Sequence, residues 1–299
     1  MLWPYKGVFV FMTGRFFLGC AVWAHKDWVG ELFPAGSKSA DLLNLYSRRL
    51  TTVEGNTTFY ATPGEQVVAR WAAETPDTFR FCLKLPRDVS HAGALVPQIA
   101  QTRSFVERMQ LLGPRLGPFF LQLPPSFHPR QLPDLAQWLA AWPAEERISV
   151  EVRHIDWFAP AAEHALSALL AQHHAGRVLM DVRPLDLGHL PGAEEDMRRA
   201  RDNKPAVPLH LVQTSNIALV RFIGHPDADR NLPLIDAWAG TIAGWLAAGV
   251  DVYFFMHCPV ERISPTLCWM LQERLLGVPG VPPLPWTSAD DPPRQASLF

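Results

Sequence analysis

Hydrophobic residues recur along the chain in two patterns: short runs with period two, rich in β-branched and aromatic residues, and longer runs with helical spacing. The first pattern predicts buried strands and the second predicts amphipathic helices. Strands are expected at 16–22, 52–56, 79–84, 118–123, 148–153, 177–183, 218–223 and 250–256. Helices are expected at 39–50, 63–73, 99–112, 132–142, 159–173, 234–248 and 264–276, with a short charged one at 194–201.

Strands and helices alternate throughout this pattern, which is typical of a parallel sheet covered by helices. Eight such units in one line predict a single TIM-type (β/α)₈ barrel of the α/β class over residues 16–277. A doubly wound open sheet is the alternative. The absence of a Gly-rich phosphate fingerprint after any of the strands counts against it.

Three segments fall outside the regular alternation. Residues 1–15 are predicted to be an N-terminal extension, with Met12 as an alternative start. Residues 278–299 are rich in proline and predict an extended, disordered tail. The longest irregular connection, 184–216, is the length expected of a lid or a binding loop.

Composition narrows the class of protein. The chain is 48% hydrophobic and 19% charged with a net charge of −2, so no overall basic field points to nucleic acid. Its four cysteines are scattered without a CxxC pair, which fits a reducing compartment and offers no zinc–thiolate site. No apolar run approaches the roughly 20 residues of a membrane span. A cytoplasmic protein is expected.

Polar side chains mark the ends of the predicted strands. Glu151 and Arg153 share one face of a strand that should be buried. Buried charges are costly unless they form ion pairs or take part in binding or catalysis. The same pattern recurs at other strand ends: Glu54, Asn56, Lys84, Gln122, Asp181, Arg183, Arg221 and His257. Barrel enzymes carry their sites at these ends, so a functional mouth is predicted, with His91 contributed by the loop after the third strand.

The cations in this set favour an anionic, phosphate-bearing ligand, because Arg and Lys grip phosphate and carboxylate groups. The residues expected to hold it are Asn56, Lys84, His91, Gln122, Arg153, Arg183 and Arg221. Proton transfer is expected from Glu54, Glu151, Asp181 and His257. These four could instead ligate a divalent metal, although the interspersed cations compete for them and no HxH or HExxH motif is present. No cofactor is expected, with a divalent metal as the alternative.

Other polar and aromatic residues have plainer interpretations. His154 and Trp157 are expected to cap the loop after the fifth strand, and Trp23 and Trp28 either stack on a ligand or form a wall of the mouth. The basic residues of the charged helix are expected to form a solvated face, with a phosphate-contacting lid as the alternative: Arg198, Arg199, Arg201 and Lys204. Cys82 and Cys258 are interpreted as packing residues.

Five motifs with this order and spacing resemble the YecE-like family, also called domain of unknown function 72. They are Val53–Tyr60, Phe79–Lys84, Leu121–Phe127, Val150–His154 and Val220–Gly224. The resemblance covers about residues 17–276 and the tail. It implies a TIM barrel and supplies no reaction, because the family's function is unassigned. The chain departs from many members at Phe255–Cys258, where they carry Phe-Asn-Asn, which leaves a general role for His257 open.

The last five residues, Gln295–Phe299, are similar to the pentapeptide that binds the bacterial sliding clamp. Gln295, Ser297, Leu298 and Phe299 are the expected contacts, with the two apolar side chains entering a pocket. Three functions follow from the sequence. They are an enzyme acting on a phosphate-bearing substrate, a metal-dependent hydrolase or isomerase, and a non-enzymatic accessory protein delivered to replicating or repaired DNA.

Overall fold

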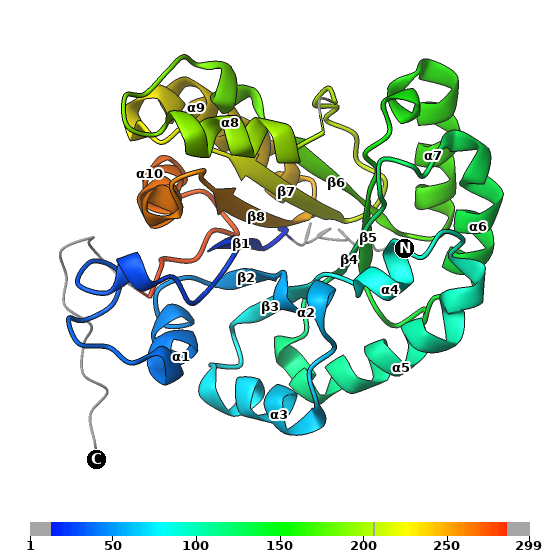
Figure 1. The fold of residues 1–299 in the computed structure, drawn as a ribbon, viewed down its shortest axis with the longest axis horizontal. Helices are drawn as coiled ribbons and strands as arrows, with labels where there is room; N and C mark the ends of the chain where they lie inside the picture. The colour runs from blue at the N-terminus through cyan, green and yellow to red at the C-terminus, as the bar shows by residue number, and fades with distance from the viewer. Residues whose placement is uncertain (1–12, 206, 286–299) are drawn as a thin grey trace, which may run out of the picture.

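A computed structural model describes residues 13–205 and 207–285, and eight strands form its centre (Figure 1). The strands are β1 (Phe16–Cys20), β2 (Thr52–Gly55), β3 (Arg80–Leu83), β4 (Phe119–Gln122), β5 (Ile148–Glu151), β6 (Gly176–Asp181), β7 (Ile217–Ile223) and β8 (Asp251–His257). They are hydrogen-bonded in parallel in the order β3-β2-β1-β8-β7-β6-β5-β4.

Helices connect and surround the strands (Figure 1). They are α1 (Leu42–Tyr46), α2 (Thr57–Tyr60), α3 (Glu65–Glu74), α4 (Arg87–Ser90), α5 (Ile99–Met109), α6 (Leu132–Ala140), α7 (Pro160–Gln172), α8 (Glu194–Asn203), α9 (Leu232–Ala247) and α10 (Ser264–Arg274). Proline occupies one of the first two positions of α6, α7, α9 and α10, where its missing N–H costs no hydrogen bond.

The two end strands of the sheet, β3 and β4, meet through isolated parallel bridges. These bridges pair Phe81 with Leu116 and Lys84 with Phe120, and Leu85 N–H donates to Phe120 O over 3.0 Å. The sheet is therefore nearly closed on itself. This arrangement confirms the predicted TIM-type barrel and excludes the open doubly wound sheet.

Side chains alternate between the two faces of the barrel wall, as the pleat of a strand requires. An inner cluster fills the barrel with Phe17, Cys82, Phe120, Val178, Ile217, Leu219, Tyr253 and Phe255. The neighbouring positions, such as Val220 and Phe254, belong to a much larger outer cluster between strands and helices. Inward-facing positions beyond the apolar layer, toward the carboxyl ends of the strands, include Glu54, Gln122, Glu151 and Arg221.

Three predicted connections differ from the structure. The helix expected at 39–50 is a 3₁₀ turn followed by the short α1. The residues that follow the second strand form α2, and its Phe59 ring lies against Lys84 Nζ. The polar loop after the third strand contains α4 and ends in His91.

The start of the predicted tail packs on the barrel. Leu284 is buried, Gln272 Nε2 donates to Pro282 O over 2.9 Å, and Phe16 N–H donates to Gly280 O over 2.9 Å. A buried leucine and two hydrogen bonds therefore hold the segment 278–285 against the barrel. The clamp-like peptide 295–299 lies outside the described residues. Within the described ranges, no helix is both long and apolar enough to cross a bilayer.

Candidate functional site

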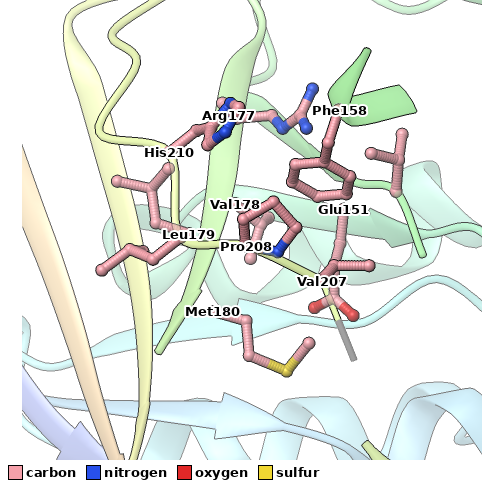
Figure 2. Close-up of a pocket in the computed structure, with 11 residues that line it drawn as sticks. Glu151, Phe158, Arg177, Val178, Leu179, Met180, Val207, Pro208 and His210 are labelled. Carbon is pink, nitrogen blue, oxygen red and sulfur yellow. The ribbon is translucent and has the colours of Figure 1, made fainter. Parts of the chain in front are cut away.

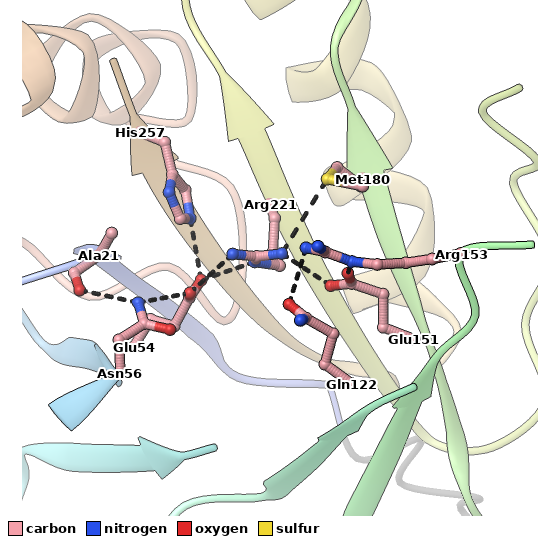
Figure 3. A network of polar contacts seen from close by, with 9 residues as sticks. All are labelled: Ala21, Glu54, Asn56, Gln122, Glu151, Arg153, Met180, Arg221 and His257. Carbon is pink, nitrogen blue, oxygen red and sulfur yellow. Dashed lines mark hydrogen bonds and ion pairs between the residues drawn. The ribbon is translucent and has the colours of Figure 1, made fainter. Parts of the chain in front are cut away.

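A buried ion network lies at the carboxyl end of the barrel, centred on Arg221 of β7 (Figure 3). Arg221 donates from Nε and Nη2 to the two oxygens of Glu54 over 2.9 and 3.0 Å. Its Nη1 donates to Glu151 Oε2 over 2.7 Å. All three residues are at most 3% exposed. One guanidinium therefore joins two carboxylates that come from two non-adjacent strands, β2 and β5.

Four further residues extend this network. Arg153 donates from Nε to Glu151 Oε1 over 2.6 Å and from Nη2 to Gln122 Oε1 over 2.7 Å. Asn56 donates from Nδ2 to Glu54 Oε1 over 2.7 Å, and His257 Nε2 lies 2.8 Å from Glu54 Oε2. Every carboxylate oxygen of Glu54 and Glu151 thus has at least one hydrogen-bonding partner.

These contacts hold both carboxylates in the ionised form. Burial favours the neutral acid, but Arg221 and His257 outweigh it and keep the pKa of Glu54 well below its usual range. Burial is likewise outweighed at Glu151, where Arg221 and Arg153 lower the pKa to about 2. Neither group is suited to exchange a proton near neutral pH. Glu54 and Glu151 are also poor candidates for metal ligands, because their oxygens already bind cations and amides.

His257 is neutral at physiological pH. Burial lowers its pKa to about 4, even though Glu54 acts in the opposite direction. Because ionised Glu54 can only accept, the neutral ring must carry its proton on Nε2 and donate it to Glu54. Nδ1 then keeps the lone pair, so His257 can accept a hydrogen bond from a ligand but is a weak base.

Two lysines stand beside the network without an anionic partner. Lys84 follows β3 and is 7% exposed, with Nζ 3.9 Å from the centre of the Phe59 ring. Lys204 follows α8 and is half-buried. Within residues 13–205 and 207–285, neither ammonium forms an ion pair. Burial, followed by Arg221, lowers the pKa of each lysine to about 8. The charges of the same four groups influence the pKa of both lysines, so both lie close to the network: Glu54, Glu151, Arg153 and Arg221.

A cavity of about 400 Å³ adjoins the network at Lys204. It lies between the end of β6 and the segment after α8, and its ionisable lining residues are Arg183, Asp186, Arg201 and Lys204. Met180 connects the cavity to the network, since its Sδ lies 3.9 Å from Arg221 Nη1. Arg183 and Arg201 are paired with Asp181 and Asp186, so Lys204 is the cation of this lining that has no ion-pair partner among the described residues.

A second, smaller pocket lies behind Glu151, between β5, β6 and residues 207–210 (Figure 2). Its volume of about 20 Å³ has room for about one water molecule. Pro208 and His210 close it, and His210 Nδ1 lies 2.5 Å from Glu163 Oε2. The segment after α8 is therefore packed across the mouth on this side.

The structure brings most of the predicted site residues together. Those within the network or beside it are Glu54, Asn56, Lys84, Gln122, Glu151, Arg153, Arg221 and His257. His91 lies nearby, with its ring 5.0 Å from that of Phe59, and burial and then Lys84 lower its pKa to about 4. The predicted roles of these residues in binding or catalysis remain predictions.

Asp181 and Arg183 are the exceptions. Asp181 was expected to face the mouth, but it points outward and accepts from Trp238 Nε1 on α9 over 2.8 Å. The reason is the pleat of β6: Met180 faces Arg221 inside, so the next residue must face the helices. Arg183 follows Asp181 outward and binds it through two hydrogen bonds of 2.9 and 2.7 Å. Arg183 lies outside the network but lines the 400 Å³ cavity.

Among the basic residues of the charged segment, Lys204 departs from the solvated face that was predicted. Arg198 behaves as predicted, exposed and paired with Glu195 and Asp202. Lys204 instead lines the cavity beside the network, as the phosphate-contacting lid alternative would require. Two features of the sequence pointed to this position, namely its place in the charged segment and the length of the connection 184–216. Trp28, which was expected at the mouth, is a core residue packed on Phe33 and Tyr46.

Comparisons with known proteins agree with this fold. The family model described as "Protein of unknown function DUF72" matches residues 17–289. The chain is 38% identical over 285 residues to the UPF0759 protein YecE of Escherichia coli, covering 95% of this chain and 99% of the relative. It is 25% identical over 202 residues to the UPF0759 protein YunF of Bacillus subtilis, covering 65% of this chain and 69% of the relative.

Two solved structures share the fold. A DUF72 family protein from Thermotoga maritima superposes with a TM-score of 0.65 at 19% identity, covering 86% of this chain and 97% of the other. A DUF72 family protein from Enterococcus faecalis superposes with a TM-score of 0.65 at 17% identity, covering 87% and 95%. At these identities the likeness concerns the fold alone.

Proposed function

The chain belongs to the DUF72 family, and we propose that the mouth of its barrel binds a phosphate-bearing small molecule as the substrate of an enzyme. The observation that carries this proposal is the excess positive charge beside the ion network. Glu54 and Glu151 supply two negative charges and Arg153 and Arg221 two positive ones, so the network is neutral. Lys84 and Lys204 then add two positive charges that nothing among the described residues neutralises.

A buried cation without a partner is costly, and a bound anion removes that cost. Phosphate suits the site because it offers several acceptor oxygens to ammonium and guanidinium donors. The cavity at Lys204, with Arg183 and Arg201 in its lining, supplies room for the rest of the molecule. Arg221 is fully engaged by the two carboxylates, so its role in this proposal is to position Glu54 and Glu151 rather than to hold the ligand.

The pKa values of the groups at the mouth favour the lysines for proton transfer. A general base works best with a pKa near the operating pH, and the two lysines, with pKa values of about 8, come closest. The pKa values of Glu54, Glu151 and His257 all lie far below 7. In this proposal they orient the ligand and the lysines, and Lys84 or Lys204 exchanges the proton.

We expect phosphate binding to weaken as the pH rises through about 8, because both lysines lose their charge there. Between about pH 7 and about pH 9 the dissociation constant for glycerol 3-phosphate should rise roughly tenfold or more. The phosphate itself is fully ionised above about pH 7, so its own titration does not weaken binding. Isothermal titration calorimetry at each pH measures the effect, with sulfate as an anion whose charge is constant over the range. Two outcomes would contradict the proposal: no binding at both pH values, or an affinity that does not change with pH.

The C-terminal peptide carries a second proposal, that the protein docks on the sliding clamp of its own organism. The sequence Gln295–Phe299 presents a glutamine, a leucine and a terminal phenylalanine in the order of clamp-binding peptides. We expect removal of residues 295–299 to raise the dissociation constant for purified clamp at least about tenfold, since the two apolar anchors are lost. Surface plasmon resonance on full-length and truncated protein measures this. Equal binding by the two forms would show that the peptide is not the docking element.

A further inference from the structure

The loops after β4 and β5 meet at the rim of the barrel mouth and bring two histidines into contact. His128 lies between β4 and α6, and His154 lies directly after Arg153. Their ring centroids are 3.8 Å apart. Asp156 follows on the same loop as His154, with Oδ2 3.7 Å from His154 Nδ1. His154 caps the 3₁₀ turn that follows it by accepting from Asp156 N–H, but this role does not require a second imidazole beside it.

From this convergence we propose that His128, His154 and Asp156 bind one divalent transition-metal ion. One ligand atom from each of the three residues lies within 4.8 Å of the others. A metal ion holds nitrogen and oxygen ligands at about 2.0–2.2 Å, so its ligand atoms are normally about 3–3.5 Å apart. Small side-chain rotations close this difference, because Asp156 is 61% exposed and free to move.

The two loops are held together independently of any metal. Trp157 Nε1 donates to Phe127 O over 2.8 Å, and the rings of Phe127 and Trp157 stack with centroids 6.4 Å apart. Both residues are buried. Phe127 immediately precedes His128, and Trp157 immediately follows Asp156. His128 and His154 are therefore positioned by the core, which is the support that a metal site needs around its ligands.

The tautomer of His154 also fits. Its Nδ1 accepts from the backbone N–H of Asp156 over 3.2 Å, so this nitrogen carries the lone pair. It is the nitrogen that lies toward Asp156 Oδ2. A metal ion placed between the two atoms would replace one long hydrogen bond with a coordinate bond.

Two imidazoles and one carboxylate favour Zn²⁺, Co²⁺, Ni²⁺ or Cu²⁺ over Mg²⁺ and Ca²⁺, which prefer all-oxygen sites. Three protein ligands leave at least one coordination position for water or a ligand. Arg153 joins the same loop to the anion network. An ion at this rim would thus add positive charge at the mouth, but its binding does not depend on the proposed phosphate site.

The test is equilibrium dialysis of untagged, chelator-treated protein against Zn²⁺, with bound metal measured by mass spectrometry. The expected result is one Zn²⁺ per wild-type chain. His128→Ala and His154→Ala should each raise the dissociation constant more than about 100-fold, since losing even a group that only orients a ligand costs 10–100-fold. With Co²⁺ as the probe, the visible d–d absorption of a nitrogen- and oxygen-ligated ion should appear in the wild type and disappear in both variants.

The matched control is His189→Ala, which removes an exposed histidine of the 184–216 connection. It should leave stoichiometry and affinity unchanged. His154→Ala also removes the cap of the loop, so Asp156→Asn provides a variant that keeps the loop geometry and should weaken binding at least about tenfold. Unchanged Zn²⁺ binding in the His128 and His154 variants, or no binding by the wild type at about 100 μM Zn²⁺, would overturn the proposal. Phosphate titration of the same variants reports separately on the anion site.

Discussion

Replacing Arg221 with Met is expected to lower the free energy of unfolding by about 3–5 kcal/mol. Methionine fills much of the same volume but leaves Glu54 and Glu151 buried without the guanidinium that joins them. The loss is large because both carboxylates are at most 2% exposed and water cannot replace the missing donors. Urea denaturation followed by tryptophan fluorescence measures it.

The pH dependence of this loss identifies its cause. In the wild type, Glu54 and Glu151 have lowered pKa values, so their stabilisation is present above about pH 4.3 and is lost as the pH falls toward about 2. Without Arg221, burial raises the pKa of Glu54, while Glu151 keeps Arg153, and the folded variant is then destabilised most at neutral pH. The difference between the two proteins should therefore be largest near pH 7 and shrink below about pH 4.

Arg198→Met provides the control, because Arg198 forms ion pairs on the exposed face of α8 and should leave stability unchanged within error. A double variant, Arg221→Met with Glu54→Gln, should recover part of the loss, since it removes the carboxylate left without a charged partner, whereas Glu151 keeps Arg153. If the single variant is as stable as the wild type at pH 7, the network is not a structural element of the barrel.

The barrel itself could be predicted from the sequence because its signal is repeated. Eight alternations of strand and helix admit few parallel folds, and an error in one boundary, such as that of α1, does not change the answer. The charged residues at the ends of β2, β5 and β7 indicated a site because each stands between apolar residues of a strand that should be buried.

The orientation of Asp181 could not be predicted in this way. Both faces of a parallel strand are buried, so Val178 and Leu179 give no indication of which one faces the barrel interior. The polar residue was assigned to the mouth, whereas its partner is Trp238 on the neighbouring helix. The partner lies 57 residues away in the chain and could be identified only from the packed structure.

His128 was missed, and Lys204 was assigned to a solvated face with the lid only as the alternative, for a different physical reason. Each becomes significant only when a connecting segment folds across the mouth or against another loop. Lys204 belongs to a charged stretch whose exposed members, such as Arg198, really are solvated. His128 and His154 are separated by a strand and a helix, so no local spacing links them.

Removing both unpaired lysines is expected to weaken binding of glycerol 3-phosphate about 100-fold or more. Each charge-assisted hydrogen bond contributes about 1.5–3 kcal/mol, and 1.4 kcal/mol corresponds to tenfold in affinity. The variant Lys84→Met, Lys204→Met keeps the apolar stems and removes the ammonium groups, and with them the contact of Lys84 Nζ with the Phe59 ring. Calorimetric titration near pH 7, where both lysines of the wild type are charged, measures the loss.

The same variant should be at least as stable as the wild type. Folding lowers the pKa of both lysines from their ordinary values to about 8, so the charged groups oppose folding at neutral pH and do so less as the pH rises above 8. Weaker ligand binding together with unchanged or greater stability is the signature of a binding site, since a structural pair would lose both. Lys38→Met, at an exposed lysine outside the network, is the control and should change neither property. A double variant that binds the phosphate as well as wild type would show that the excess charge beside the network serves another purpose.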